Sequence, residues 1–397
     1  MLALCDCNNF FVSCERLYRP ELKNRPVVVL SSNDGCIIAR SNEVKAMGIK
    51  TGEPYFQLQH LLKQKGVVVC SGNLVAYKEI SDKVMQVLSR CTDAMESYSI
   101  DEAFLNFPRQ AARNPTEYAS KIRRYVDRMV GIPLSVGVAP SKTLAKLATS
   151  RAKKSDSGVL EITEQNRLPI LSDTNVQDVW GIGYKTGEKL RRCGIYTAAD
   201  YVKKDPVWVK KYLTIKGVMT QYELSGQPCI PLVTQAAPPK SIQVSRTWGS
   251  VLESREDIDC AILDNVLKAG NLLRKSKLMT SSMGVYLRYG YRHHGECGYF
   301  TEDAHFENPI LSDTQLIYAA RWLLDKIYRP GYRYTQGGVI LCQFSDANYR
   351  QRELFDDGIY EKRERLERFS HAVDVINKHY GERVIYPAML AITSNSG

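Results

Sequence analysis

The chain has 397 residues and a mass of 44.9 kDa, enough for about two to four domains of roughly 150 residues each. Hydrophobic residues make up 44% and charged residues 24%, which excludes wholesale disorder and a collagen-like repeat, and the absence of a long apolar run excludes a membrane span. The net charge is +11, with most of the excess in residues 141–240. Such an excess favours a polyanionic partner, although a basic protein without one stays an open alternative.

The N-terminus, Met1–Asp6, has neither the basic start nor the long apolar segment of a signal peptide, so we expect a cytoplasmic protein. The 11 cysteines are odd in number and scattered, which argues against a disulfide framework. The closest pair, Cys5 and Cys7, has no second pair at zinc-binding spacing.

Residues 1–165 mix short apolar runs with helical patterns, which predicts an α+β core. The predicted strands are Leu2–Cys5, Val27–Leu30, Val67–Val69, two short strands within Met95–Asn106, and Leu134–Val138. The predicted helices are Ser41–Met47, Tyr77–Ser89, Tyr118–Met129 and Ser141–Lys153.

Residues 170–234 read as all-helical, and Thr234–Lys240 with its two prolines reads as a linker. Residues 241–345 then follow the order βαββαβ, a two-layer α+β arrangement. Its predicted elements are Ile242–Trp248, Asp257–Lys275, Met283–Tyr289, Gly298–Phe300, Thr314–Ile327 and Gly338–Phe344. A last helix, Tyr360–Tyr380, carries one predicted apolar stripe formed by Leu366, Phe369, Val373 and Ile376.

Three acidic residues, Asp6, Asp101 and Glu102, adjoin apolar, strand-like sequence. A carboxylate at the end of a core strand loses hydration, and a divalent cation is one way to compensate for that loss. Neighbours on a regular strand point to opposite faces, so Asp101 and Glu102 can share one site only if Ser99–Glu102 forms a turn. The alternative is an acidic hairpin tip paired with surface lysines.

The segment Asp6–Glu15, together with Ser99–Phe104, resembles the Y-family translesion DNA polymerases. Further motifs resemble the UmuC-type catalytic subunits of bacterial DNA polymerase V and their plasmid- or element-borne relatives. These motifs are Asn33–Arg40, Ser97–Glu102, Ser141–Lys146 and Val179–Gly183. The resemblance runs from residue 1 to about residue 355.

The resemblance implies an α+β multidomain fold shaped as a right hand. Its implied parts are a palm (1–10 and 72–168), fingers (11–71), a helical thumb with a helix-hairpin-helix (169–234), a linker (235–240), a βαββαβ little finger (241–345) and a tail with a clamp-binding motif (346–397). The implied activity is error-prone, template-directed DNA synthesis on primer-template DNA with dNTPs, in translesion synthesis and SOS mutagenesis. A non-catalytic DNA-binding or scaffolding relative is the alternative.

By resemblance, Asp6, Asp101 and Glu102 are the catalytic carboxylates, and with the Cys7 carbonyl they hold two Mg²⁺ ions, for which Mn²⁺ can substitute. Phe11 falls at the steric-gate position, where Tyr is frequent in this subfamily. The other residues implied near the nucleotide are Asn8, Asn9, Phe10, Arg40, Lys45 and Lys153. A core role for Phe10, and solvated or structural roles for Arg40 and its neighbour Asn42, stay open.

The hairpin glycines Gly181 and Gly183, followed by Lys185, are expected to hold DNA phosphates, and Arg246 is a further predicted DNA contact. Gln351, Leu354 and Phe355 resemble a peptide that docks on the sliding clamp. A UmuD′-type dimer and RecA are partners implied by the resemblance alone. The tail departs from the family pattern, because no Lys or Arg follows Arg383.

Overall fold

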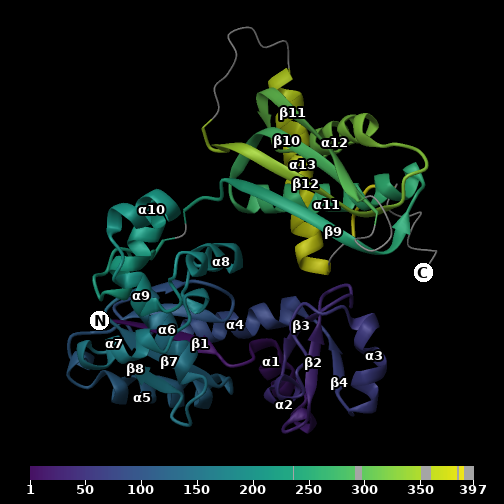
Figure 1. Cartoon of the computed structure of the whole chain (residues 1–397). Coiled ribbons are helices and arrows are strands. Elements are labelled where there is room, and N and C mark those ends of the chain that lie inside the picture. Colours follow the sequence, from purple (N-terminus) through teal and green to yellow (C-terminus); the bar gives the residue numbers. More distant parts are fainter. Residues whose placement is uncertain (236, 291–296, 350–358, 382–383, 389–397) are drawn as a thin grey trace. The chain divides into compact units, whose positions relative to one another are not determined.

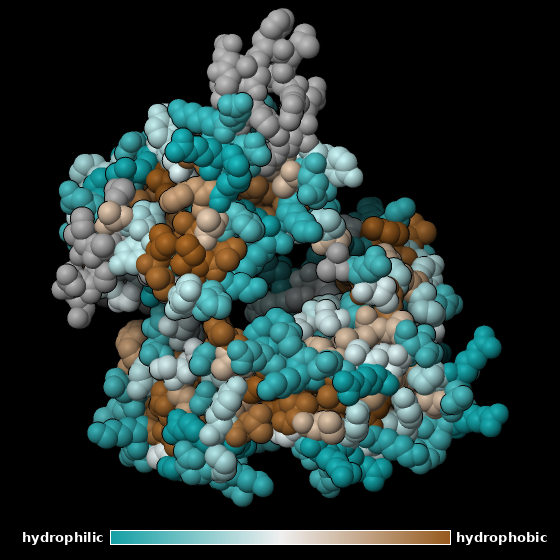
Figure 2. All heavy atoms as spheres, turned by 180° about the vertical axis from the view of Figure 1, so that it is seen from behind, coloured by the Kyte–Doolittle hydropathy of each residue, from teal (hydrophilic) through white to brown (hydrophobic). Residues whose placement is uncertain are grey.

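The computed structural model describes residues 1–235, 237–290, 297–349, 359–381 and 384–388 (Figure 1). The chain forms two compact units, Met1–Ala236 and Ala237–Gly397. Within the described residues, no helix is long and apolar enough to cross a membrane. Figure 2 shows the molecule from behind, with hydrophobic patches separated by hydrophilic side chains.

A five-stranded sheet of order β5-β6-β1-β7-β8 organises the first unit. Its strands are β1 (Leu2–Cys7), β5 (Ala94–Ser97), β6 (Glu102–Asn106), β7 (Leu134–Ala139) and β8 (Val159–Glu161). They come from the two ranges that the sequence analysis assigned to the palm. The central strand β1 pairs antiparallel with both β6 and β7, so a residue at its end lies in the middle of the sheet.

Helices cover the two faces of this sheet, and the alternation of side chains along β1 decides which residue meets which helix. Ala3, Cys5 and Cys7 join one hydrophobic cluster, whereas Leu4 joins another that includes Leu144 and Ala148. The first cluster packs α1 (Phe10–Tyr18), α4 (Leu74–Ser89) and α5 (Pro115–Val130), and the second packs α6 (Lys142–Ala152). Asp6 has the parity of Leu4 and therefore faces α6.

Close packing of α6 on the sheet depends on Gly137 in β7. A Cβ atom built at this position would lie 2.2 Å from the backbone nitrogen of Thr149. The Thr149 hydroxyl donates a hydrogen bond to the Leu4 carbonyl at 3.1 Å, which ties the same turn of α6 to β1. These two contacts hold α6 directly against β1.

A smaller sheet of order β3-β2-β4 lies in the range assigned to the fingers. Its strands are β2 (Val27–Leu30), β3 (Ile37–Arg40) and β4 (Val68–Ser71), and its helices are η1 (Pro20–Leu22), α2 (Asn42–Ala46) and α3 (Tyr55–Gln64). Val28, Leu30, Ile37, Val44 and Leu62 form its core. The sheet places α2, the helix that contains Lys45, beside the start of α1.

The prediction that residues 170–234 are helical is confirmed up to Leu224, and residues 225–234 contain no helix. The helices in and just before this range are α7 (Glu164–Ser172), η3 (Val176–Asp178), α8 (Tyr184–Arg192), α9 (Ala198–Val202) and α10 (Pro206–Leu224). A separate short helix, η2 (Ala111–Arg113), precedes α5. Glu223 is buried and accepts amide hydrogens from Thr143 at 2.9 Å, Cys229 at 2.7 Å and Ile230 at 3.0 Å. These bonds join the end of α10 to the start of α6.

The second unit has the predicted βαββαβ order. Its elements are β9 (Ser241–Leu252), α11 (Arg255–Lys275), β10 (Leu278–Tyr289), β11 (Gly298–Ile310), α12 (Asp313–Ile327) and β12 (Tyr334–Asp346). The antiparallel sheet has the order β11-β10-β12-β9, and α11 and α12 pack on one face. The predicted strand Gly298–Phe300 was too short, because the charged residues that follow it continue along an edge strand with alternating exposure.

A final helix, α13 (Ile359–Tyr380), packs against α12. Arg274 of α11 joins it to the unit by ion pairs with Asp374 at 2.5 Å and Asp313 at 2.7 Å. Ser370 accepts a hydrogen bond from the Asp313 amide at 3.0 Å. Of the predicted apolar stripe, Leu366, Val373 and Ile376 are partly buried, whereas Phe369 is 62% exposed.

Candidate active site

Asp6 and Glu102 lie directly opposite each other on neighbouring strands. They are paired residues in the antiparallel register of β1 and β6. Glu102 shares its strand parity with Phe104, which belongs to the α6 cluster, so both carboxylates face α6. Asp6 is only 6% exposed. The sheet therefore brings together two acidic side chains that are far apart in the sequence.

The segment Ser99–Glu102 forms the predicted turn. The amides of Tyr98 and Ser99 donate to the Glu102 carbonyl at 3.0 and 3.1 Å. The Ser99 hydroxyl donates to a carboxylate oxygen of Asp101 at 2.6 Å, and the Cys7 amide donates to the Asp101 carbonyl at 2.9 Å. The turn thus fixes Asp101 beside the end of β1, although its side chain bonds to Ser99.

Two lysines of the α6 region neutralise the paired acids. Lys153 Nζ lies 2.6 Å from Asp6 Oδ2, and Lys146 Nζ lies 3.1 and 3.0 Å from the two oxygens of Glu102. Lys146 is largely buried, which does not fit the alternative of an acidic tip paired with surface lysines. Among the described residues, no group of three or more His, Cys, Asp or Glu side chains converges closely enough to hold a metal ion.

Asp6 nonetheless keeps one oxygen available. Burial raises the pKa of Asp6 to about 7, Lys153 opposes this rise, and the charges of Glu102 and Asp101 add to it. Its second oxygen, Oδ1, is buried without a hydrogen-bond partner. An unsatisfied buried carboxylate oxygen is costly. It is the kind of atom that a hard cation would bind, so Asp6 offers one ligand position for a divalent ion at this edge.

A second group of predicted residues gathers around Asn9. Lys45 donates a hydrogen bond to Asn9 Oδ1, and Asn9 donates to Asn42 Oδ1 at 3.0 Å. Asn9 has a left-handed backbone, with φ of 47°, where β1 turns into α1. Burial lowers the pKa of Lys45, and the nearby positive charges of Lys153 and Arg40 lower it further. Three cations from separate segments therefore lie near one another, which suits a polyanionic ligand.

The other residues of this group have structural contacts. Arg40 donates to the Ile49 carbonyl. The Asn8 amide donates to the Pro133 carbonyl at 2.8 Å, and the Ser135 hydroxyl donates to the Asn8 side chain at 2.8 Å. Phe10 is 4% exposed and lies in the core, as the alternative for this residue stated.

Phe11 stacks on Tyr77, a contact that the sequence analysis missed. The two ring centroids lie 5.0 Å apart at an interplanar angle of 24°. Tyr77 is fully buried and donates a hydrogen bond to Glu15 at 2.5 Å. Glu15 belongs to the same helix as Phe11, so this helix and α4 together fix the orientation of the Phe11 ring.

The glycine hairpin before α8 has the geometry that the sequence suggested. Gly181 has φ of 89°, a conformation that L side chains rarely adopt, and Gly183 is the N-cap of α8. Lys185 lies exposed in the first turn of α8. In the second unit, Arg246 of the edge strand β9 pairs with Gly337 of β12. Gln351, Leu354 and Phe355 lie outside the described residues.

A cavity of about 300 Å³ opens beside the paired acids. Its lining includes Asp6, Glu102, Lys146, Lys153 and Trp180. The sequence analysis did not single out Lys146 or Trp180 as site residues. The only available signal was their position inside the motifs Ser141–Lys146 and Val179–Gly183.

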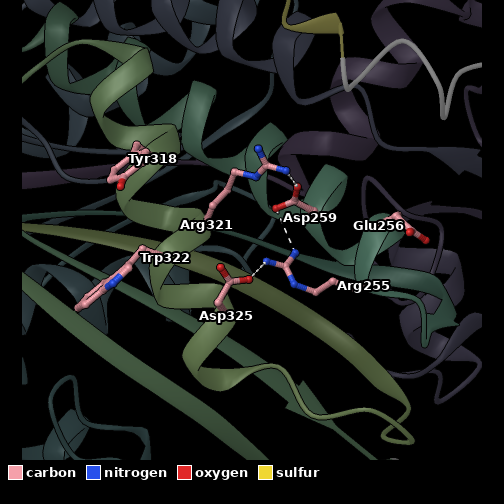
Figure 3. Close-up of a pocket in the computed structure, with 7 residues that line it drawn as sticks. All are labelled: Arg255, Glu256, Asp259, Tyr318, Arg321, Trp322 and Asp325. Carbon is pink, nitrogen blue, oxygen red and sulfur yellow. Dashed lines mark hydrogen bonds and ion pairs between the residues drawn. The ribbon is translucent and has the colours of Figure 1, made fainter.

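A second hollow of about 480 Å³ lies on the helical layer of the other unit (Figure 3). Its charged residues neutralise one another: Arg255 lies 3.2 Å from Asp259 and 2.5 Å from Asp325, and Arg321 lies 3.0 Å from Asp259. Figure 3 shows these four side chains meeting between α11 and α12, with Tyr318 and Trp322 to one side. The paired charges make this hollow a poorer candidate for catalysis than the acids of the first unit.

Family models match both units of the chain. The impB/mucB/samB family matches residues 5–150, and the C-terminal domain of the same family matches residues 239–354. The chain belongs to this family. It is 34% identical to Protein ImpB of Salmonella typhimurium, over 95% of this chain and 90% of that protein. It is 35% identical to Protein UmuC of the same species, over 97% of this chain and 92% of that protein.

More distant relatives and solved structures extend the likeness. DNA polymerase IV of Dehalococcoides mccartyi is 28% identical over 95% of this chain and 94% of that protein. A Y-family DNA polymerase chimera of Dbh and Dpo4 has a TM-score of 0.70 at 22% identity, covering 86% of this chain and 98% of the other. An insertion ternary complex of Dbh DNA polymerase has a TM-score of 0.57 at 21% identity, with the same coverage. The predicted fold, that of a Y-family polymerase, is confirmed.

Proposed function

We propose that Asp6, Asp101 and Glu102 carry out nucleotidyl transfer from a dNTP to a primer 3′-hydroxyl. The chain is a DNA-directed DNA polymerase of the translesion type, and its UmuC and DNA polymerase IV relatives support this assignment. The observation that carries the catalytic proposal is the register pair Asp6–Glu102, in which Asp6 keeps one buried oxygen without a partner. The presence of all three acids, Asp6, Asp101 and Glu102, speaks against the alternative of a non-catalytic scaffold.

Two divalent cations, Mg²⁺ or in its place Mn²⁺, would be held by the three carboxylates and the Cys7 carbonyl. When bound, such ions activate the primer hydroxyl and stabilise the charge of the leaving pyrophosphate. The chain itself supplies position and charge. The turn at Ser99 holds Asp101 beside β1, and the sheet register holds Asp6 against Glu102.

Lys45 and Lys153 supply the positive charge for the triphosphate. Lys45 is bonded to Asn9, and Lys153 is bonded to Asp6. A lysine is a point charge with three donors, which suits phosphate oxygens in several orientations. Asn8 and Asn9 lie where β1 leads into α1, and their segment would place backbone amides near the same phosphates. Arg40 adds to the local positive charge.

The test of this proposal is primer extension by the Asp101→Asn variant. We expect the transfer rate to fall by about 10³-fold, because the variant lacks a charge that stabilises the transition state. DNA affinity should persist, because it depends mainly on Lys and Arg contacts to phosphates. A variant that extends primers at the wild-type rate would show that Asp101 is not part of the site.

We also propose that Phe11 is the steric gate that excludes ribonucleotides. Its ring is fixed by the stack on Tyr77, so it cannot turn aside to admit a 2′-hydroxyl. In Phe11→Ala, incorporation of ribonucleotides relative to deoxynucleotides should rise by about tenfold or more, measured by single-nucleotide insertion. An unchanged ratio with intact deoxynucleotide insertion would place the gate at another residue.

The duplex is proposed to contact the hairpin at Gly181 and Gly183, with Lys185, while Arg246 contacts DNA from the second unit. The hairpin geometry supports the first contact, because glycine allows close approach of amides to a phosphate. The same proposal includes the domain boundaries stated above for the palm, fingers, thumb, linker, little finger and tail. Binding of a sliding clamp through Gln351, Leu354 and Phe355, and of a UmuD′-type dimer and RecA, is proposed from family likeness.

A further inference from the structure

The two lysines at the paired acids make different contacts. Lys153 bonds to one oxygen of Asp6, and its side chain is 41% exposed. Lys146 bonds to both oxygens of Glu102, and its side chain is 17% exposed. A lysine that bonds to both oxygens restricts the rotation of the carboxylate as well as balancing its charge. Lys146 therefore does more to orient its partner than Lys153 does.

Aromatic rings hold Lys146 in turn. Its ammonium lies 4.3 Å from the centre of the Tyr98 ring and 5.5 Å from the centre of the Trp180 ring, within the range of cation–π attraction. Tyr98 and Trp180 also contact each other edge to face, with centroids 5.8 Å apart. Tyr98 leads into the turn of the catalytic acids, and Trp180 belongs to the glycine hairpin Val179–Gly183.

We propose that Lys146 is a positioning residue that orients Glu102 and links it, through Trp180, to the hairpin expected to hold DNA. The inference rests on the proposed role of Glu102 as a cation ligand. Lys146 does not touch the reacting atoms in this account. It sets the direction of the Glu102 carboxylate, and the aromatic pair sets the direction of Lys146.

The proposal predicts two effects of opposite sign when the ammonium is removed. A positive charge beside Glu102 repels an incoming cation, so its removal should tighten cation binding. The freed carboxylate would no longer be held in one orientation, so transfer should become slower, as when groups that orient metal ligands are removed. A variant that is only misfolded would lose both cation affinity and activity.

The experiment compares full-length Lys146→Met, Lys146→Arg and the control Lys121→Met. Lys121 forms an exposed ion pair with Glu117 on α5, at 2.7 Å, and has no aromatic ring contact among the described interactions. The control therefore removes an exposed Lys–Glu pair from the same unit. Mn²⁺ binding without DNA is measured from the electron paramagnetic resonance of the free ion, with Asp6→Asn as the background. Transfer rate, dNTP KM and DNA affinity come from single-turnover primer extension and fluorescence anisotropy.

For Lys146→Met we expect Mn²⁺ binding about tenfold tighter, because a charge that repels the cation is lost. Transfer should be about 10- to 100-fold slower, with dNTP KM and DNA affinity within about twofold. Lys146→Arg should stay within about fivefold of the wild type in every measurement, because a guanidinium can bond to both oxygens and stack on the rings. Trp180→Leu should slow transfer in the same direction by a smaller factor, while Trp180→Phe should not. Lys121→Met should behave as the wild type.

Unchanged Mn²⁺ binding and transfer in Lys146→Met would overturn the inference, and so would loss of both together with no rescue by arginine. Glu102→Gln separates this failure from failure of the proposed function. If Glu102→Gln remains active, Glu102 is not a catalytic ligand and the proposed function itself is wrong. If Glu102→Gln is inactive while Lys146→Met is normal, only the positioning role is lost.

Discussion

One cluster of acidic and basic side chains in the first unit and one in the second differ in how completely their carboxylates are hydrogen-bonded. The acid edge consists of Asp6, Glu102, Lys146 and Lys153. The arginine cluster consists of Arg274, Asp313 and Asp374. In the arginine cluster, one guanidinium donates to both oxygens of Asp313 at 2.7 and 3.0 Å and to both oxygens of Asp374 at 2.5 and 2.9 Å.

The difference lies in the cation. The planar fork of arginine matches two carboxylates at once, and Arg274 with its partners joins α11, α12 and α13. Burial raises the pKa of Asp374, but hydrogen bonds from Arg274 and Asn271 outweigh burial and leave it below its usual value. For Asp313, burial outweighs the opposing charge of Arg274 and the pKa is raised. The lysines of the acid edge are point charges that leave Asp6 Oδ1 without a partner and the pKa of Asp6 raised to about 7. We infer that the arginine cluster stabilises the fold and that the acid edge is prepared for a ligand.

The largest effect that would sharpen this comparison is expected from Asp6→Asn. The transfer rate should fall by about 10³-fold, since a cation ligand is lost. The melting temperature should stay the same or rise, because ionised Asp6 is costly to bury and functional carboxylates often reduce stability. Primer extension and thermal denaturation on one preparation check both. A strong loss of stability in Asp6→Asn would make the acid edge a structural cluster like the other.

Asp374→Asn should give the reverse pattern. Removing the charge leaves Arg274 with one ionised partner in a site where it is only 6% exposed, which should cost about 2 kcal/mol of unfolding free energy. The transfer rate without clamp should stay within about twofold. Denaturant titration and primer extension measure the two quantities. A variant with normal stability and reduced transfer would contradict the inference that the arginine cluster stabilises the fold.

The smallest effect is expected when a lysine of the acid edge is replaced by arginine. In Lys153→Arg, the guanidinium fork can reach both oxygens of Asp6 and satisfy the oxygen that is now free. The Mg²⁺ concentration for half-maximal extension should rise by about tenfold, equivalent to about 1.4 kcal/mol. A titration of Mg²⁺ in primer extension checks this. An unchanged Mg²⁺ dependence would indicate that the free oxygen is not the site of the cation.

Much of the fold was predictable, because it depends on local pattern. The βαββαβ order follows from strand and helix periods, and the turn at Ser99–Glu102 follows from two acids between two apolar runs. The position of Asp6 at the end of a strand follows in the same way. The register that sets Asp6 opposite Glu102 is consistent with the family resemblance, but periodicity alone does not give it.

The parts that the sequence did not predict depend on tertiary contacts. Lys146 contacts Glu102, which is 44 residues away, and Trp180, which lies beyond β8 and α7, and no periodic pattern encodes such contacts. The Tyr77 stack on Phe11 is of the same kind. On α13, Ser370 and Asp374 bond to residues of α11 and α12, and an apolar pattern cannot reveal such polar contacts.

The central claim is that the acid edge binds the cations of nucleotidyl transfer. The most direct test is the anomalous scattering of Mn²⁺ in crystals of the chain with primer-template DNA and a non-hydrolysable dNTP. The account predicts Mn²⁺ peaks on Asp6 Oδ1, Asp101 and Glu102, with Lys153 bonded to the triphosphate. Manganese peaks elsewhere, or a bound nucleotide with Lys153 still on Asp6 and no ion beside it, would contradict the account.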